Sequence, residues 1–325
     1  MTEIIKVNPS MPEKAKIRRA AQLLSQGKVV AFPTETVYGL GCNAFDEDAV
    51  EKVFKAKGRP SDNPLIVHIG SKRQLPILVS GISEKEKKLI DAFFPGPLTL
   101  IMNKTGIVPY ATSGGLETVA IRMPKHKVAQ AILKEAGIPI AAPSANISGR
   151  PSSTTAEHVI SDFMGRVDAI VDGGKSRIGL ESTVVDASTS EILRPGGITK
   201  EEIEKVIGRV EISTASTNKS PGMKYRHYAP SAKVILFTGR KKAIQEYADR
   251  LMKSKKVGVI SIYHSFRADE ARHAGNSLHE YARSIFALFR ELEEKVDVIL
   301  VEGVEEKGIG IAIMNRLRKA ASEIV

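Results

Sequence analysis

The chain has 325 residues, of which 42% are hydrophobic, and its length allows two ordinary domains with a core each. No apolar run approaches the ~18 residues of a membrane span, and the first residues lack an apolar signal core. The single cysteine, Cys42, excludes an intrachain disulfide and a thiolate metal cluster. We therefore expect a folded soluble protein of the cytoplasm.

The net charge is +11, from 48 basic and 37 acidic residues. An excess of this size favours polyanionic partners or substrates through long-range attraction, although many such charges simply lie on solvated helix faces. The aromatic content is only 5% and tryptophan is absent, so no base-stacking platform is evident.

The first two-thirds of the chain alternates helical and strand patterns. Amphipathic helices are expected at 12–28 and 46–58, the second ending at Gly58, and a further helix at 127–137. Short apolar runs predict strands at 29–32, 65–69, 97–102, 119–123, 138–142, 168–172, 182–186 and 191–195. The pairs 97–102/119–123 and 182–186/191–195 are too close in sequence for helical crossovers, which favours a mixed sheet.

A second domain follows a segment rich in Ser, Thr, Asn, Gly and Pro. We divide the chain into a first domain at 1–212, a linker at 213–232 and a second domain at 233–325. Strand and helix patterns alternate in the second domain, which predicts a small Rossmann-like parallel sheet covered by helices. The fold class is α/β throughout.

Lys55, Lys57 and Arg59 crowd together just before Pro60. Like charges repel, so this cluster is either a solvated helix end or a site for an anion. It belongs to one of four polar loops that leave strand ends, where α/β sheets usually bind ligands. The loops are 32–41, 57–64, 142–154 and 181–186. Ordinary turn chemistry is the alternative reading for each.

Three polar side chains fall within strands. Strand alternation places His68 on the face of Ile66, opposite Leu65 and Val67. Arg122 and Arg194 each need an acidic partner or an anionic ligand, because an unpaired buried guanidinium costs several kcal/mol. Protein partners for the two arginines could be Glu35, Glu181 or Asp186.

Cations, hydroxyls and amides without an evident nucleophile or carboxylate dyad suit a reaction driven by positioning and charge neutralisation, as in nucleotidyl transfer. No metal-ligating cluster is apparent either. Glycine motifs at 39–44 and 173–176 lack the strand–turn–helix setting of a nucleotide fingerprint.

Seven stretches, in uninterrupted order over about 10–210, resemble the L-threonylcarbamoyladenylate synthase family, with its YrdC-like domain. They are FPTETVYGLG, KAKGRPSDNPLIVHI, FFPGPLTLIM, VAIRMP, PIAAPSANISGRPSST, STVVD and LRPGG. SPGMKYRHYAP followed by a small α/β domain resembles the two-domain form. The resemblance implies a twisted open mixed sheet with a basic concave face.

It also implies that L-threonine, bicarbonate and ATP give threonylcarbamoyl-AMP and pyrophosphate, for N6-threonylcarbamoyladenosine at position 37 of tRNAs that read ANN codons. Lys57 and Arg59 would be catalytic and bind ATP. The remaining nucleotide-binding residues implied are Asn63, Thr118, Ser144, Asn146, Ser152 and Arg194. L-Threonine would meet Thr34, His68, Arg122 and Ser182. Tyr225, His227 and Tyr228 would belong to a lid formed by the linker, for which a mere tether is the alternative.

We expect Mg²⁺ to accompany ATP, held mainly by the phosphates, with no organic cofactor and no metal site of the protein's own. Partners would be the three substrates, and possible further ones are tRNA or the proteins that receive the product. A different class of function, a non-catalytic RNA-binding module using the basic face, is compatible with the charge. A carbamoyl-phosphate-dependent domain of similar fold is a third reading.

Overall fold

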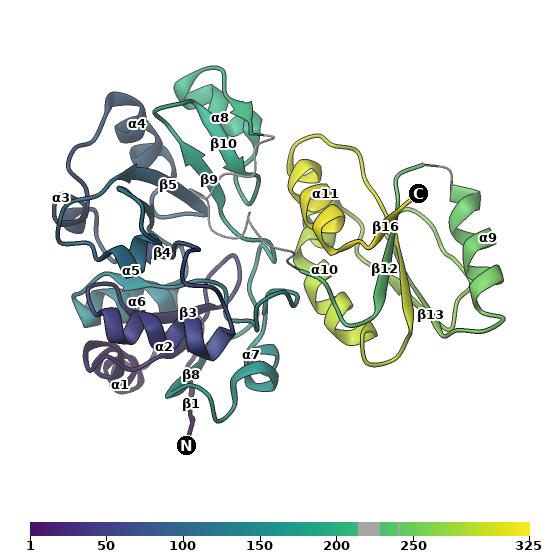
Figure 1. Ribbon diagram of the computed structural model, residues 1–325, viewed down its shortest axis with the longest axis horizontal. Helices are drawn as coiled ribbons and strands as arrows, with labels where there is room; N and C mark the ends of the chain where they lie inside the picture. Colours follow the sequence, from purple (N-terminus) through teal and green to yellow (C-terminus); the bar gives the residue numbers. More distant parts are fainter. Residues whose placement is uncertain (214–227, 240) are drawn as a thin grey trace. The chain divides into compact units, whose positions relative to one another are not determined.

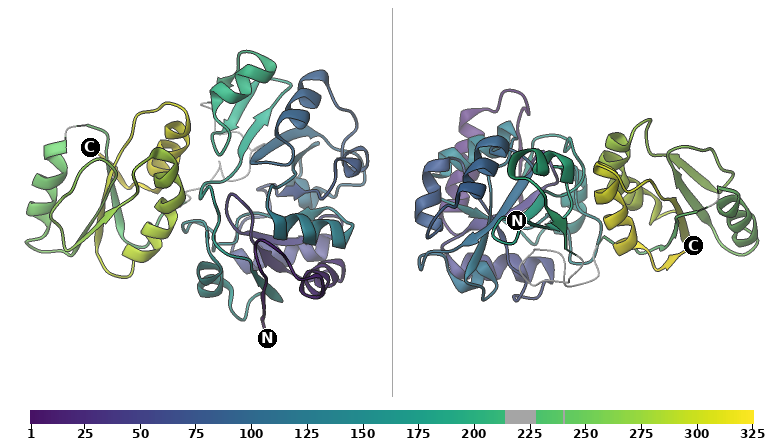
Figure 2. Two further views of the ribbon diagram at one scale, coloured as in Figure 1. Left: turned by 180° about the vertical axis from the view of Figure 1, so that it is seen from behind. Right: turned by 90° about the horizontal axis from the view of Figure 1, so that it is seen from above.

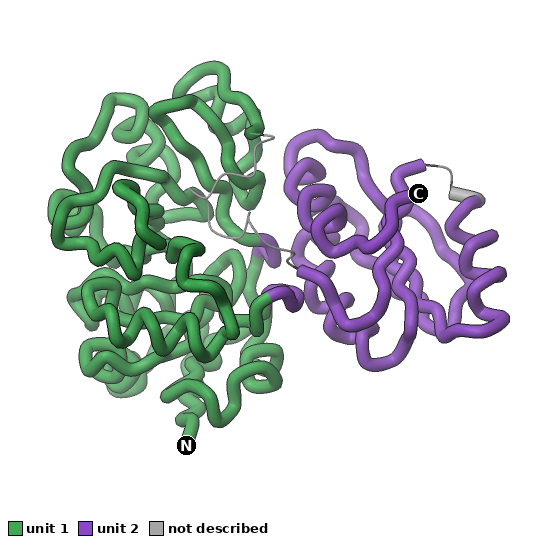
Figure 3. Tube along the Cα trace, in the orientation of Figure 1, with its two compact units in different colours: residues 1–148, 153–177, 181–224 green, residues 149–152, 178–180, 225–325 purple. Residues whose placement is uncertain are grey.

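The computed structural model describes residues 1–213, 228–239 and 241–325. The chain clusters into two compact units (Figure 3). Unit 1 comprises Met1–Ser148, Ser153–Arg177 and Glu181–Lys224, and unit 2 comprises Gly149–Ser152, Ile178–Leu180 and Tyr225–Val325. Two short segments that the sequence analysis placed in the first domain therefore cluster with the second. Most of the expected linker at 213–232 lies outside the described residues.

Unit 1 contains a mixed sheet in the order β1-β8-β2-β3-β7-β4-β6-β5-β9-β10-β11. The pairs β5/β6 and β9/β10 are antiparallel, as their short connections predicted, whereas β4/β6 and β5/β9 are parallel. The strands are β1 (Glu3–Lys6), β2 (Val30–Phe32), β3 (Gly39–Asn43), β4 (Ile66–His68), β5 (Leu98–Asn103), β6 (Thr118–Arg122), β7 (Ile140–Ala141), β8 (Ala169–Asp172), β9 (Thr183–Asp186), β10 (Glu191–Arg194) and β11 (Glu211–Ile212).

Helices cover this sheet on both faces (Figure 1). α1 and α6 pack side by side over β1, β2 and β8, while the larger core lies on the opposite face under the other helices. The helices of unit 1 are α1 (Lys14–Ser25), α2 (Glu47–Lys57), α3 (Leu75–Leu78), α4 (Glu84–Phe93), α5 (Tyr110–Ser113), α6 (Lys127–Ala136), α7 (Ala156–Phe163) and α8 (Lys200–Ile207).

The ends of α2 follow the sequence prediction. The Asp46 carboxylate accepts a hydrogen bond from the Ala49 backbone N–H, which satisfies one of the unpaired donors of the first turn. Gly58 ends the helix in the left-handed conformation, with φ 61°, which glycine adopts without a steric penalty. This stop turns the loop after Gly58 out of the helix.

β3 differs from the prediction, which read residues 32–41 as a loop. A Cβ on Gly41 would lie 2.6 Å from Phe32 Cε1 and 2.9 Å from Ile140 Cγ2, so neighbouring side chains close over the glycine. A strand that uses glycine for this close approach shows no alternation of apolar residues, and the sequence pattern therefore missed it.

Unit 2 is built on an all-parallel sheet in the order β14-β13-β15-β12-β16, which confirms the predicted small parallel domain. Its strands are β12 (Lys233–Phe237), β13 (Val257–Ser261), β14 (Glu270–His273), β15 (Val298–Glu302) and β16 (Glu323–Ile324). α9 (Lys241–Leu251) covers one face, and α10 (Leu278–Leu292) and α11 (Ile309–Ala320) cover the other (Figure 2).

Candidate active site

An apolar patch marks one face of the central strands of unit 1. It is separate from the main core and consists of Ile66, Ile101, Ala120, Val184 and Leu193. Leu65, Val67 and Ile69 belong to the core on the other face, so the predicted alternation along β4 is confirmed. We call the five-residue patch the apolar floor, because the predicted site residues gather at its edges.

A row of polar side chains crosses the sheet at one edge of the apolar floor. His68 is in register with Arg122 between the parallel strands β4 and β6, and Arg122 is in register with Thr99 on β5. Residues in register point to the same face, so the three side chains are neighbours. Thr99 was missed by the sequence analysis, since a threonine in an apolar strand is common and its partner is distant in sequence.

The row continues onto β9 and β10. Thr99 Oγ1 lies 2.7 Å from Ser182 Oγ, and Arg194 Nη2 donates to the carbonyl oxygen of Ser182 at 3.0 Å and to its hydroxyl at 3.1 Å. Ser182 and Arg194 are both buried. The structure thus brings together His68, Arg122, Ser182 and Arg194, four residues from distant parts of the sequence.

Arg122 is buried and contacts three groups from distant parts of the chain. Its Nε donates to the carbonyl oxygen of Gly96 at 3.3 Å, and its Nη1 donates to Thr36 Oγ1 at 2.8 Å. Its Nη2 lies 2.7 Å from Glu35 Oε1 in an ion pair whose side chains are 4% and 7% exposed. Of the three acids considered from the sequence, Glu35 is therefore the one that pairs with Arg122.

The loop between β2 and β3 supplies this partner through a compact hydroxyl network. Thr34 Oγ1 lies 2.8 Å from Thr36 Oγ1 and donates to the Val37 carbonyl oxygen at 2.5 Å. Ser176 Oγ holds the Thr34 carbonyl from a third segment at 3.0 Å. All of these side chains are buried, so this loop, which the sequence analysis read as a candidate ligand-binding loop, is packed beside Arg122 rather than exposed as an ordinary turn.

His68 is neutral over the physiological pH range. Complete burial, and secondarily the charge of Arg122, lower the pKa of His68 to about 3. Its Nδ1 lies 3.1 Å from the Ile66 carbonyl oxygen, and its ring packs edge-on against Phe32. A neutral imidazole beside an ion pair offers a hydrogen bond without adding charge.

A second group of predicted residues forms around the end of α2. Lys57 is only 2% exposed, and its Nζ donates to the carbonyl oxygens of Ser144 and Asn146, both at 2.5 Å. Lys55, two residues earlier, is exposed. The solvated-helix-end reading is therefore wrong for Lys57 and right for Lys55.

Arg59 shapes the loop that follows α2. Its Nη2 donates to the backbone carbonyl oxygens of Asn63 and Pro64, at 3.1 and 2.9 Å. Asn63 is buried, and Thr118 is half-buried at the first position of β6. Thr118 and Arg122 occupy opposite ends of β6, about 13 Å apart at the usual rise per residue. The predicted residues therefore form two groups at the two ends of these strands.

The other predicted residues belong to unit 2 or lie outside the described part. Ser152 is buried in the segment Gly149–Ser152. Arg290 of α10 donates to the neighbouring Pro151 carbonyl oxygen through Nη2 at 2.7 Å, which anchors this segment. Tyr228 stacks on Phe286 with ring centroids 5.3 Å apart. Tyr225 and His227 lie outside the described residues.

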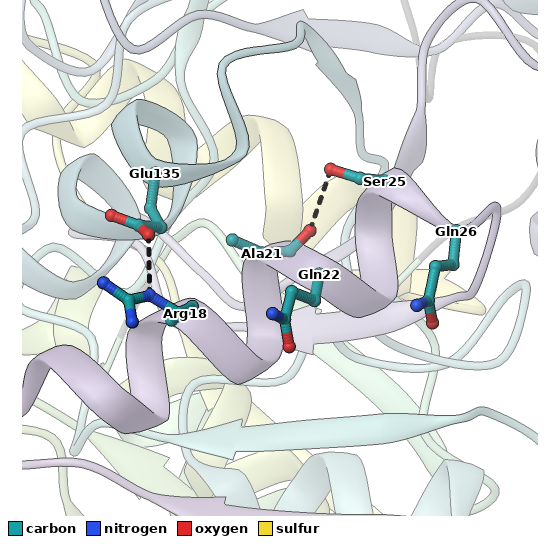
Figure 4. A pocket seen from close by; sticks show the side chains of 6 residues that line it. All are labelled: Arg18, Ala21, Gln22, Ser25, Gln26 and Glu135. Atoms are coloured by element: carbon teal, nitrogen blue, oxygen red, sulfur yellow. Dashed lines mark hydrogen bonds and ion pairs between the residues drawn. The ribbon is translucent and has the colours of Figure 1, made fainter.

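A surface pocket of about 400 Å³ lies elsewhere, beside α1 (Figure 4). Arg18 and Glu135 bridge its rim at 3.3 Å in an exposed ion pair, and its other lining residues are neutral. Its lining residues are Arg18, Ala21, Gln22, Ser25, Gln26 and Glu135. None of them belongs to the two groups, and an exposed rim pair of this kind contributes little binding energy.

Metal-ligating side chains do not gather anywhere in the described part of the chain. Within these residues, no three His, Cys, Asp or Glu side chains are grouped to hold a metal ion. No described helix combines the length and apolar composition that a bilayer crossing requires.

Comparison with known proteins matches both parts of the chain. The family described as "Telomere recombination" matches residues 22–196, and the family described as "Threonylcarbamoyl-AMP synthase, C-terminal domain" matches residues 198–322. The chain is 52% identical to the threonylcarbamoyl-AMP synthase of Pyrococcus abyssi, over 99% of this chain and 98% of that one. It is 48% identical to the Bacillus subtilis protein of the same name, over 94% and 93% of the two chains.

A solved structure agrees over the whole length. The crystal structure of Pyrococcus abyssi Sua5 complexed with L-threonine superimposes with a TM-score of 0.95 at 51% identity, covering 100% of both chains. The fold is thus that of a two-domain α/β enzyme. The chain belongs to the threonylcarbamoyl-AMP synthase family, which confirms the resemblance drawn from its motifs.

Proposed function

We propose that this protein converts L-threonine, bicarbonate and ATP into threonylcarbamoyl-AMP and pyrophosphate. The threonine amine attacks the bicarbonate carbon and expels water, and a carbamate oxygen then attacks the α-phosphorus of ATP while pyrophosphate leaves. By this reaction the protein is a nucleotidyltransferase. Membership of the threonylcarbamoyl-AMP synthase family supports this reaction. The solved structure of a relative in complex with L-threonine supports L-threonine as a substrate.

The observation that carries the proposal is the arrangement of two polar groups at the two ends of β4 and β6. One contains Lys57 and Arg59, whose cationic side chains could offset the triphosphate charge and stabilise the departing pyrophosphate. The other contains His68 and Arg122, and the planar guanidinium of Arg122 matches a carboxylate. We assign ATP to the first group and L-threonine to the second.

The other predicted contacts follow this division with one exception. Asn63, Thr118, Ser144, Asn146 and Ser152 are assigned to the nucleotide, and so is Arg194, although it lies in the polar row. Thr34 and Ser182 are assigned to the amino and hydroxyl groups of threonine. The hydroxyls of Thr34 and Ser182 are already held by neighbouring groups, so their orientations are fixed before a ligand arrives.

We propose that Mg²⁺ binds together with ATP, through the phosphates, and not at a metal site formed by the protein. Lys57 and Arg59 donate to backbone carbonyl oxygens, and a metal held mainly by phosphate oxygens and water would need no carboxylate from the protein. When bound, the ion would neutralise phosphate charge beside Lys57 and Arg59.

Further proposals concern the context of the reaction. We place the enzyme in the cytoplasm and its product in N6-threonylcarbamoyladenosine formation at position 37 of tRNAs that read ANN codons. The linker segment containing Tyr225, His227 and Tyr228 is proposed as a lid over the substrates. Unchanged turnover together with unchanged retention of the adenylate after deletion of 213–325 would contradict the lid proposal.

The test of the main proposal is pyrophosphate release with mass-spectrometric detection of the adenylate. Release is expected only when L-threonine, bicarbonate and ATP are all present, and Lys57→Ala should abolish it. Carbamoyl phosphate should not replace bicarbonate. Tight, salt-sensitive RNA binding without threonine-dependent ATP consumption would instead establish the RNA-binding module.

A further inference from the structure

Glu35 is a buried carboxylate of unit 1 without hydrogen-bond donors among the described residues. Its residue is 5% exposed, and neither carboxylate oxygen has an aligned hydrogen-bond partner among the described residues. Its side chain is held instead by the 2.7 Å ion pair between Oε1 and Arg122 Nη2. Removing a carboxylate from water without hydrogen bonds is costly, so among the described residues Oε2 is a buried acceptor that lacks a donor.

Arg122 has unused capacity beside it. A guanidinium carries five N–H groups, and the contacts with Gly96, Thr36 and Glu35 engage one nitrogen each. One N–H on each of Nη1 and Nη2 therefore remains for a further acceptor. Within the described part of the chain, Glu35 and Arg122 together present a free acceptor next to free donors.

An α-amino acid carries the complementary pair of charges. We propose that Glu35 binds the α-ammonium group of L-threonine through Oε2 and removes its proton, while Arg122 holds Glu35 in place and binds the α-carboxylate. This inference rests on the proposed function only in taking L-threonine as the substrate. Glu35 becomes a binding and catalytic residue, a role that the sequence analysis did not give it.

In the proposed chemical step Glu35 accepts a proton from the substrate. The ammonium passes one proton to the Glu35 carboxylate, and the free amine then forms its N–C bond with bicarbonate as water leaves, giving the carbamate. The proton passes from Glu35 to solvent after the product has left. An amine must be unprotonated to attack, so a proton acceptor at this point raises the reactive fraction at neutral pH.

Three charged or titratable residues lie around Glu35. Arg122 of β6 is in contact with it, Arg177 donates a backbone N–H to its carbonyl oxygen at 3.1 Å, and His126 lies close enough for their charges to interact. Burial lowers the pKa of His126, so that imidazole is neutral and does not compete for the Glu35 charge. Arg122 is the cation in direct contact with the Glu35 carboxylate.

The test is calorimetric titration without ATP, using L-threonine and (2S,3R)-2,3-dihydroxybutanoate, in which a hydroxyl replaces the ammonium. The unaltered protein should prefer L-threonine by about 10- to 100-fold, the value of a charged hydrogen bond. Glu35→Gln keeps the shape and removes the charge, and it should reduce the preference to under about threefold. A preference retained in Glu35→Gln would overturn the proposal.

The pH dependence of the reaction rate tests whether Glu35 also accepts the proton. In Glu35→Gln, adenylate formation at saturating threonine should rise roughly tenfold per pH unit up to the pKa of the substrate amine, because only free amine reacts. The unaltered protein should show a much flatter profile. Parallel rate–pH profiles for Glu35→Gln and the unaltered protein would overturn the catalytic role of Glu35.

Two control variants separate a specific effect of Glu35 from a general effect of losing a carboxylate and from misfolding. Glu135→Gln removes an exposed carboxylate on α6 and should change neither measurement. If Glu35→Gln fails to fold because Arg122 is left unpaired, Glu35→Gln/Arg122→Gln removes both charges, and it should bind the two ligands equally weakly. Since the titrations contain no ATP, failure of the full reaction would leave their result intact.

Discussion

Lys57 Nζ donates to the backbone carbonyl oxygen of Ser144 at 2.5 Å, so the last residue of α2 ties the helix directly to the loop after β7. The same ammonium holds the Asn146 carbonyl. Both of these acceptors are neutral carbonyl groups, which orient the ammonium through hydrogen bonds. Lys57 thus both shapes the loop and places a positive charge beside it.

Lys57→Met should therefore damage both stability and activity. Two carbonyl oxygens lose a charged donor, which should lower the free energy of unfolding by about 1–3 kcal/mol, and pyrophosphate release should become undetectable. Urea unfolding and the release assay measure the two effects. Lys55→Met, on the exposed side of the same turn, should behave like the unaltered protein, and an equal loss there would point to helix propensity instead.

Thr99→Val tests the polar row without changing a charge. The substitution removes the 2.7 Å contact with Ser182 Oγ and leaves that hydroxyl with Arg194. We expect a loss of about 1 kcal/mol in unfolding free energy and a higher KM for threonine at nearly constant kcat. Thr189→Val, at an exposed turn, is the control. A fall in kcat alone would contradict a role in holding the substrate.

His68 should make stability depend on pH. Its pKa is about 3 in the folded protein, against 6.5 for an exposed histidine, so the unfolded chain takes up the proton first as pH falls. The stability that neutral His68 contributes is complete above pH 6.5 and declines below it, with a slope approaching about 1.4 kcal/mol per pH unit. Unfolding titrations between about pH 7 and pH 5 should show a shallower decline for His68→Gln, and identical slopes would refute this.

Gly41→Ala should destabilise the junction of β2, β3 and β7. The added methyl would lie 2.6 Å from Phe32 Cε1 and 2.9 Å from Ile140 Cγ2, and overpacking of this kind costs about 1–3 kcal/mol. Gly81→Ala meets no atom within 4 Å and is the matched control. Thermal unfolding of both variants measures the difference.

Local rules predicted much of the fold. Short connections indicated the antiparallel pairs β5/β6 and β9/β10, strand alternation placed His68, and Gly58 ended α2 as expected. These features depend on residues close in sequence. The family motifs then selected residues that the sheet register brings into two groups.

Long-range contacts explain what the sequence left open. The burial of Lys57 depends on carbonyl groups 87 and 89 residues away, and the choice of Glu35 over two other acids depends on how the β2–β3 loop folds against β6. The clustering of 149–152 with unit 2 depends on Arg290, 139 residues beyond Pro151. None of these pairings has a local pattern.

The apolar floor of Ile66, Ile101, Ala120, Val184 and Leu193 bears on the lifetime of the carbamate. Carbamates revert to amine and carbon dioxide once they are protonated. Aliphatic side chains carry no exchangeable hydrogen, so a carbamate bound against them would have no acid beneath it and would be expected to persist long enough to reach phosphorus.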